Sequence, residues 1–183
     1  MSANDALFPA LLGPRWNALP ARVRALHGAE GEVSARGCAS VSGNPRWPAR
    51  LLRGALGLPA PCTNVAVDIT INREGFQETW RRRFAGAHMD SHLRRSSRHP
   101  QAFEERLGAA CLAFTLDDSD GGLRWVAREV RFLGVPLPLR WFDGIDARCS
   151  EREGRYRFDI NVRLPGLGLL VAYAGWLEVV DAR

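Results

Sequence analysis

The chain contains no lysine, so all 25 of its basic residues are arginines, and its formal net charge is +5 at pH 7. Alanine, glycine, leucine and proline are abundant, and the bias toward arginine is typical of a GC-rich genome, whose codons favour Arg over Lys. The basic charge is therefore weak support for a nucleic-acid partner. The runs Arg81 to Arg83 and Arg94-Arg95 are not interleaved with an exposed aromatic platform. We therefore predict no nucleic-acid binding.

Targeting and membrane signals are also missing. No run approaches the roughly 18 consecutive apolar residues of a membrane-spanning helix, and the first residues lack the basic region and apolar core of a signal peptide. We expect no transmembrane segment and a cytoplasmic location. The cysteines are scattered with no C-x-x-C spacing, which favours buried thiols over a disulfide framework or a zinc site; they are Cys38, Cys62, Cys111 and Cys149.

Motifs for catalysis or cofactor binding are absent from the sequence. There is no G-x-G-x-x-G after a strand and no G-x-S-x-G. His88, Asp90 and His92 alternate along one predicted strand face, where they would span about 13 Å and could not all reach one metal ion. We interpret them as a solvated outer face, and we expect no metal, no cofactor and no catalytic residue.

The C-terminal forty residues carry the clearest structural pattern. From Arg155 to Leu164 apolar residues occupy every even position, which predicts a half-buried strand. Pro165-Gly166 then marks a turn, and Leu167 to Leu177 is apolar at both odd and even positions. This second segment is predicted to be a strand buried on both sides.

The remaining segments predict one α+β domain, since 183 residues suffice for a single core. Leu19 to Gly28 is predicted as a short amphipathic helix, Glu32 to Ser42 as a strand, and Asn44-Pro45 as the start of a second helix ending at Gly57. From Asn64 onward the period is two. We predict a strongly curved, barrel-like antiparallel sheet of about eight strands, with two or three short N-terminal helices, over residues 19–183; residues 1–18 are an N-terminal extension.

One predicted strand face combines aromatic and charged residues. Phe76, Trp80 and Phe84 share this face, and alternation directs Glu78 and Arg82 to the same side. A buried charge must be paired or lie in a polar pocket. Arg82 could therefore belong to a structural ion pair with Glu78 or with Glu105 on a neighbouring strand, or it could anchor the carboxylate or phosphate of a ligand. A register shift that exposes both charges is a third possibility.

The segment Val135 to Trp141 is almost wholly apolar, yet two prolines exclude it from a central strand. It must be buried by the protein, by a partner or by a ligand. Packing across one end of the barrel is one interpretation, and a lip for a hydrophobic ligand, a membrane surface or a partner is the other.

Several segments, in their order along the chain, resemble the bacterial domain of unknown function 4166 family. They are Trp80-Arg81-Arg82-Arg83-Phe84, Leu133 to Pro138, Phe158 to Val162, Leu164 to Leu170 and Tyr173-Ala174-Gly175-Trp176-Leu177. The resemblance extends from about Leu19 to Val179. It implies a domain found alone or fused behind saccharopine-dehydrogenase-like NAD(P)-binding domains, and it transfers no catalytic residue.

The sequence therefore favours non-enzymatic binding of a hydrophobic or amphipathic small molecule inside the curved sheet. The candidate ligand-binding residues are Arg82, Trp80, Phe84, Glu78, Tyr173 and Trp141. One alternative is an interaction or accessory module for an NAD(P)-dependent oxidoreductase, and another is an enzyme that uses carboxylates such as Glu78. A tightly filled interior would favour the accessory module, whereas a cavity of about 300 Å³ or more that Arg82 faces would favour the binder.

Overall fold

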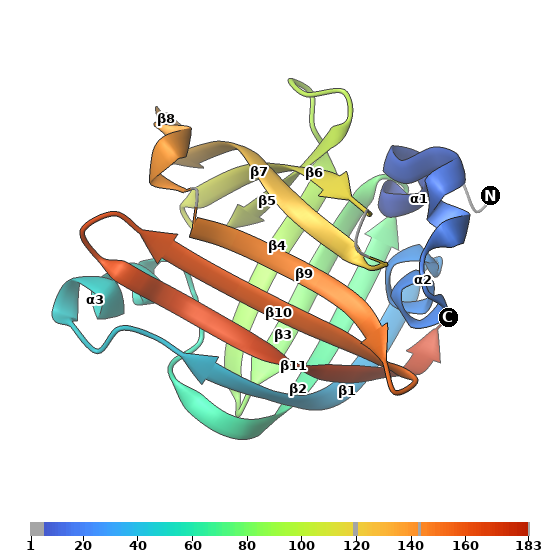
Figure 1. Ribbon diagram of the computed structural model, residues 1–183, viewed down its shortest axis with the longest axis horizontal. Helices are drawn as coiled ribbons and strands as arrows, with labels where there is room; N and C mark the ends of the chain where they lie inside the picture. Colours follow the sequence, from blue (N-terminus) through green and yellow to red (C-terminus); the bar gives the residue numbers. More distant parts are fainter. Residues whose placement is uncertain (1–5, 119–120, 143, 183) are drawn as a thin grey trace.

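A computed structural model describes residues 6–118, 121–142 and 144–182 of the chain (Figure 1). Short helical segments come first, and strands make up most of the remainder. The elements are α1 (Leu7–Leu12), the 3-10 helix η2 (Gly13–Ala18), α2 (Ala21–Gly28), β1 (Glu32–Ser42), α3 (Trp47–Ala55), β2 (Cys62–Glu74), β3 (Gln77–Phe84), β4 (Ala87–Arg95), β5 (Ala102–Leu107), β6 (Ala110–Asp117), β7 (Leu123–Phe132), β8 (Val135–Leu137), the 3-10 helix η3 (Leu139–Trp141), β9 (Gly144–Arg152), β10 (Arg155–Leu164) and β11 (Gly168–Ala182).

The strands form a closed antiparallel barrel. Their order is β6-β5-β4-β3-β2-β1-β11-β10-β9-β7-β8, and a further pairing of β6 with β7 closes the ring of ten strands, to which β8 is added. The predicted α+β barrel-like class is confirmed, and the strand number is higher than predicted. Part of the difference lies at Ala85-Gly86, which forms a tight turn with positive φ at both residues and so makes β4 a separate strand. The other additions are β5 and the three-residue β8.

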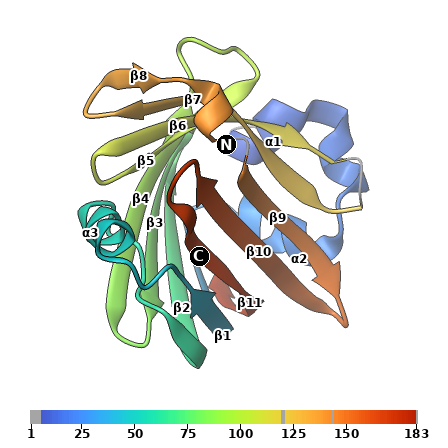
Figure 2. The same ribbon diagram turned by 60° about the vertical axis from the view of Figure 1, so that its left-hand side comes forward.

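Two strands pair with different parts of the same edge of β7. Its first residues, Leu123 to Trp125, pair with β9, whereas Val130 to Phe132 pair with β8. Strands β7 and β9 therefore pair only near one end of the barrel, and β8 takes the edge of β7 near the other end. Figures 1 and 2 show β8, α3 and the β10–β11 turn at that second end, which we call the open end.

The two C-terminal strands pair antiparallel across the predicted turn at Pro165-Gly166. Ile160 lies opposite Tyr173, and Val162 lies opposite Val171. The prediction that Leu167 to Leu177 is buried on both sides is wrong, because Ala174 is exposed on the outer face. Gly175 lies where β11 approaches β1, since a Cβ atom there would be 2.1 Å from the carbonyl oxygen of Cys38.

The opposite end of the barrel is covered by α1 and α2, and we call it the plugged end (Figure 1). Leu7 and Phe8 of α1 and Val23 and Leu26 of α2 are fully buried in the core. The ring of Phe8 packs on Phe103, with ring centroids 5.5 Å apart. Helix α1 lies in the segment that we predicted to be an N-terminal extension, and its apolar side chains fill the barrel floor.

Helix α3 begins later than predicted and turns a different face to the barrel. Asn44 forms a local turn, because its side-chain oxygen accepts the Arg46 N–H at 2.9 Å while its amide donates to Leu167 O at 2.7 Å. Within the helix Arg53 is buried, where it donates to Leu170 O at 3.0 Å. Trp47 and Leu51, which belong to the predicted apolar stripe, are exposed. No helix in the described part of the chain is long and apolar enough to cross a membrane.

Phe76 does not share the inward face of β3. It lies in the turn before the strand and is exposed, where the guanidinium of Arg95 lies 5.4 Å from the centre of its ring. Trp80, Arg82 and Phe84 are buried on the inward face, as alternation predicts.

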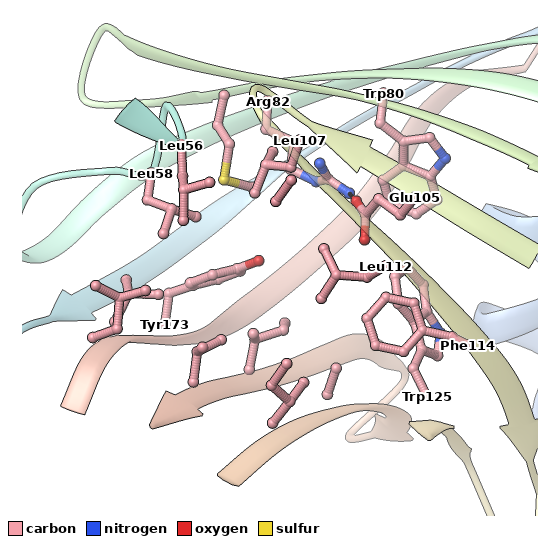
Figure 3. A pocket seen from close by; sticks show the side chains of 18 of the residues that line it. Leu56, Leu58, Trp80, Arg82, Glu105, Leu107, Leu112, Phe114, Trp125 and Tyr173 are labelled. Carbon is pink, nitrogen blue, oxygen red and sulfur yellow. Dashed lines mark hydrogen bonds and ion pairs between the residues drawn. The ribbon is translucent and has the colours of Figure 1, made fainter. Parts of the chain in front are cut away.

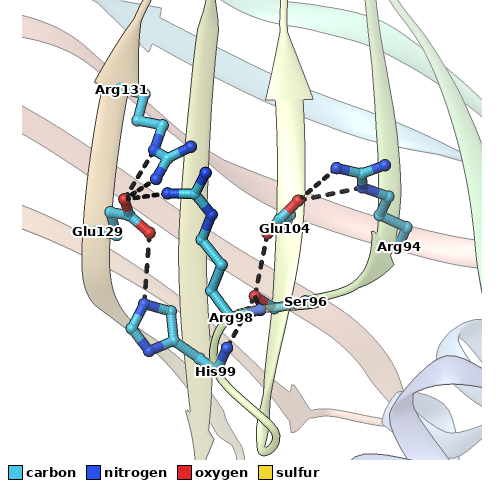
Figure 4. A network of polar contacts seen from close by, with 7 residues as sticks. All are labelled: Arg94, Ser96, Arg98, His99, Glu104, Glu129 and Arg131. Atoms are coloured by element: carbon cyan, nitrogen blue, oxygen red, sulfur yellow. Dashed lines mark hydrogen bonds and ion pairs between the residues drawn. The ribbon is translucent and has the colours of Figure 1, made fainter. Parts of the chain in front are cut away.

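A network of ion pairs crosses the outer surface of β4 to β7 (Figure 4). Glu104 accepts hydrogen bonds from Nη2 of Arg94 at 2.8 Å and from the hydroxyl of Ser96 at 3.0 Å. Glu129 accepts from Nε of Arg131 at 2.7 Å, and Nε2 of His99 lies 3.3 Å from its other oxygen. These contacts lie on the outside of the barrel wall. The two neighbouring glutamates of β5 therefore point in opposite directions, with Glu104 facing outward and Glu105 facing the interior.

The buried packing of α1 gives a stability prediction. Phe8→Ala should lower the free energy of unfolding by about 3 to 5 kcal/mol, because it leaves a void in the floor of the barrel. Phe76→Ala, the same change at an exposed position, should lower it by less than about 1 kcal/mol. Urea denaturation of both variants measures this, and equal midpoints would show that α1 is not part of the folded core.

Candidate functional site

The barrel encloses a cavity of about 360 Å³ that reaches from the open end toward the aromatic floor. Its wall is mostly apolar. Figure 3 shows Leu56 and Leu58 at one side and Phe114 and Trp125 at the other. Other lining residues include Trp80, Arg82, Phe84, Met89, Glu105, Leu112, Ala147, Ile160, Val162 and Tyr173. The volume lies within the range of small-molecule sites, about 300 to 1,000 Å³.

Arg82 and Glu105 form a charged pair in this wall. Nη2 of Arg82 lies 3.4 Å from Oε1 of Glu105, and Nη1 donates to the Ser91 hydroxyl at 2.8 Å. The guanidinium also lies 4.6 Å from the centre of the Trp80 ring, where a cation is attracted to the π face. Of the possibilities raised by the sequence, the pairing of Arg82 with Glu105 is the one observed. The cation is therefore already neutralised by the protein.

A second ion pair lies deeper, next to the plug. Nε of Arg73 lies 3.1 Å from Oε1 of Glu78, and the Trp80 indole donates to Oε2 at 2.7 Å. Burial raises the pKa of Glu78, and the nearby Arg73 opposes that rise. Arg73 also donates to the carbonyls of Ala29 and Leu26 at 2.8 and 2.5 Å. It therefore satisfies the C-terminal carbonyls of α2 and holds that helix against the barrel.

His27, at the C-terminal end of α2, is fully buried between the plug and the barrel. Its Nε2 lies 3.0 Å from the Tyr156 hydroxyl and 3.8 Å from Sγ of Cys149. Burial, reinforced by the positive charges of Arg73 and Arg82, lowers the pKa of His27 to about 3. Burial also raises the pKa of the Cys149 thiol to about 12. The imidazole is therefore neutral and the thiol protonated.

The hydroxyl of Tyr173 points into the cavity from β11 (Figure 3). The ring packs edge-on against Phe84, with centroids 5.6 Å apart, and no protein group in the described part of the chain hydrogen-bonds the hydroxyl. Burial raises the pKa of Tyr173 to about 12. A neutral hydroxyl with a free donor and acceptor therefore faces the same space as Arg82 and Glu105.

The sequence-based candidates divide into two groups. Trp80, Arg82, Phe84 and Tyr173 all line the cavity, whereas Glu78 is buried beside it and is engaged by Arg73. Trp141 lies on η3 at the open end and is exposed. The apolar segment that contains it, Val135 to Trp141, packs only partly against the protein: Leu137 reaches the cavity, while Val135 and Leu139 remain exposed. The adjacent Phe142 also lines the cavity.

Sequence reasoning missed several lining residues. Leu56 and Leu58 follow α3 and lie near the mouth of the cavity, and Trp125 of β7 forms part of its floor (Figure 3). For Leu112 and Phe114 of β6, which also line the cavity, the alternation of Leu112, Phe114 and Leu116 is the signal that places them on one face. No local pattern indicated which loop would lie over the end of the barrel.

His88, Asp90 and His92 are exposed on the outer face of β4, as predicted, and Met89, Ser91 and Leu93 are buried. In the described segments no group of three His, Cys, Asp or Glu side chains is arranged to hold a metal ion.

The family comparison agrees with the resemblance in the sequence. The model of a domain of unknown function (DUF4166) matches residues 19–177. The chain belongs to this family. Among solved structures, the crystal structure of Rv2717c from M. tuberculosis aligns with a TM-score of 0.43 and 13% sequence identity, covering 89% of this chain and 99% of that one. No curated protein gave a significant match.

The neutral state of His27 predicts a specific pH dependence. The pKa is about 3 in the folded protein and ordinarily 6.5, so the unfolded chain binds a proton between these pH values that the folded protein does not. This contribution to stability is complete above the ordinary pKa and is lost as the pH falls. Between about pH 7.5 and pH 5 the wild type should lose about 2 kcal/mol more of its unfolding free energy than His27→Gln.

His88→Gln is the matched control, because it removes an exposed histidine from the outer wall. Its loss between the two pH values should follow the wild type. Urea denaturation at both pH values gives the three losses, and equal losses for the wild type and His27→Gln would contradict the buried neutral imidazole.

Proposed function

We propose that the barrel binds a largely apolar small molecule that has one uncharged polar end. The observation that carries this proposal is the combination of a mostly apolar cavity of about 360 Å³ with a polar patch formed by Arg82, Glu105 and Tyr173. Sites for small molecules typically combine an apolar lining with a few polar groups that fix orientation. This volume exceeds the value of about 300 Å³ above which we expected ligand binding. A tightly filled interior would have favoured the accessory module.

The Arg82–Glu105 pair supports an uncharged polar end. A carboxylate placed beside this pair would add a third charge and leave a net negative charge in a poorly solvated site, which is unfavourable. A hydroxyl or amide could instead donate to Glu105 or Tyr173 and accept from Arg82 without changing the charge. Alcohols, phenols and amides therefore fit better than fatty acids or phosphates.

The state of the neighbouring cysteine supports binding without catalysis. Cys149 lines the cavity and has His27 at 3.8 Å, which is the pairing of a cysteine nucleophile with a base. An active pair needs a thiolate with a lowered pKa. Here burial raises the pKa of Cys149 to about 12 and lowers that of His27 to about 3, so proton transfer from the thiol to the imidazole is strongly unfavourable.

Filling the cavity should abolish binding. Ala147 lines the cavity, so Ala147→Phe places a ring in the space that a ligand would occupy. The uncharged fluorescent probe N-phenylnaphthylamine should bind the wild type at one molecule per chain, and this binding should be lost in Ala147→Phe. Ala174→Phe makes the same change on the exposed outer face and should bind as the wild type does.

Val162→Phe is a second cavity variant in case Ala147→Phe fails to fold, which circular dichroism would reveal. Val162 lines the cavity from β10. Saturable one-to-one binding that persists in a folded cavity variant would contradict the proposal.

The uncharged end of the ligand is tested with decanol and decanoate. Decanol should displace the probe from the wild type at a concentration at least about tenfold lower than decanoate, because decanoate adds an uncompensated charge. Glu105→Gln leaves Arg82 without its anionic partner and should improve decanoate displacement at least about tenfold. Glu104→Gln, the same substitution one residue away on the outer face, should change nothing. Stronger displacement of the wild type by decanoate would refute the uncharged end.

A further inference from the structure

The open end of the barrel is built from five connections. They are residues 43–61, which contain α3, the β3–β4 turn at 85–86, the β5–β6 turn at 108–109, the described residues 133–142 with β8 and η3, and the β10–β11 turn at 165–167. Figures 1 and 2 show α3, β8 and the β10–β11 turn together at this end. The cavity approaches the same end, since Leu52, Leu56 and Leu137 line it.

Large apolar side chains are concentrated on the outside of this end. Trp47 and Leu51, four residues apart on α3, are 72% and 65% exposed, and Trp141 of η3 is 42% exposed. Of the eight large exposed apolar residues in the described part of the chain, six lie here: Trp47, Leu51, Leu133, Val135, Leu139 and Trp141. A cluster of this kind indicates an interaction surface.

The charges at this end have a single sign. Arg46, Arg50 and Arg140 are exposed in these connections, and the described residues of the five segments include no Asp or Glu; Asp143, the next residue after η3, lies outside the described part. Turns at the plugged end are different, because they contain Glu30, Asp118 and Glu153. The apolar end is therefore also the basic end.

We propose that the open end docks onto the surface of an anionic phospholipid bilayer. Trp47, Leu51 and Trp141 insert among the headgroups, and Arg46, Arg50 and Arg140 contact lipid phosphates. Tryptophan favours the membrane–water interface, a helix with an apolar face and basic flanks lies flat in it, and arginines near the surface are attracted to anionic lipids. Helix α3 then separates the bilayer from the cavity, with Trp47 and Leu51 on one side and Leu52 on the other.

The charge pattern favours a bilayer over another copy of the chain. Two open ends facing each other would bring their arginines together with no acidic group among the described residues of either end to pair with them. An anionic membrane supplies the opposite charge over the whole surface, and it also accepts scattered apolar side chains without a matching shape. Docking of this surface needs no ligand in the cavity, so it does not depend on the proposed binding function.

Co-sedimentation with vesicles tests the proposal on the full chain. The wild type should bind vesicles of equal parts phosphatidylcholine and phosphatidylglycerol, should bind phosphatidylcholine alone at least about tenfold more weakly, and should dissociate as salt rises. The double variant Arg46→Gln, Arg50→Gln should reduce binding to anionic vesicles at least about tenfold. Arg81→Gln with Arg83→Gln removes the same charge from exposed positions on the side wall and should bind within about twofold of the wild type.

Trp47→Ser with Leu51→Ser removes only exposed side chains and should also lose binding while keeping the wild-type circular dichroism spectrum. The cavity variant Ala147→Phe should bind vesicles as the wild type does, so a failure of the ligand proposal and a failure of this one remain distinct. Equal binding by the two arginine double variants would overturn the proposal. The proposal would also be overturned if the wild type did not bind anionic vesicles and instead sedimented as a dimer, and if Trp47→Ser with Leu51→Ser made that dimer dissociate.

Discussion

Closure of the sheet with ten strands is the constraint from which the rest of this structure follows. A barrel of about eight strands is just wide enough for its own side chains to fill, and the diameter grows with strand number. The additional strands leave interior space that the strand side chains do not fill. At one end the apolar residues of α1 and α2 occupy it, with Phe8 and His27 in the floor; toward the other end about 360 Å³ remains as a cavity.

The charged residues inside the barrel are matched with each other. Arg73 pairs with Glu78 beneath the plug, and Arg82 pairs with Glu105 in the cavity wall. A buried ion pair does not by itself show that the charges stabilise the fold, because the desolvation penalty can exceed the attraction between them. The positions of these two pairs in the barrel are more informative. The inner pair also bonds the end of α2 and so fixes the plug. The outer pair faces the cavity, where we propose that it favours an uncharged polar group.

Alternation along single strands made much of the barrel predictable, and arrangements that depend on distant segments were not. The bounds of β1, the half-buried alternation of β10 and the inward direction of Trp80, Arg82 and Phe84 all follow from a period of two. The role of α1 did not, because six residues carry too little periodicity to show what they pack against. The face of α3 was misread because Trp47 and Leu51 are apolar yet exposed; a hydrophobic pattern shows that a face avoids water and does not show what covers it. The ligand-binding role of the lining residues stays a prediction.

We propose that the interior of the barrel is a ligand site rather than a void in the packing. Native mass spectrometry of the freshly purified protein tests it most directly. The wild type should carry one neutral small molecule per chain, or take up one decanol when the alcohol is added, and Ala147→Phe should do neither. Wild-type protein that shows only its own mass, both as purified and after mixing with excess decanol, would contradict it.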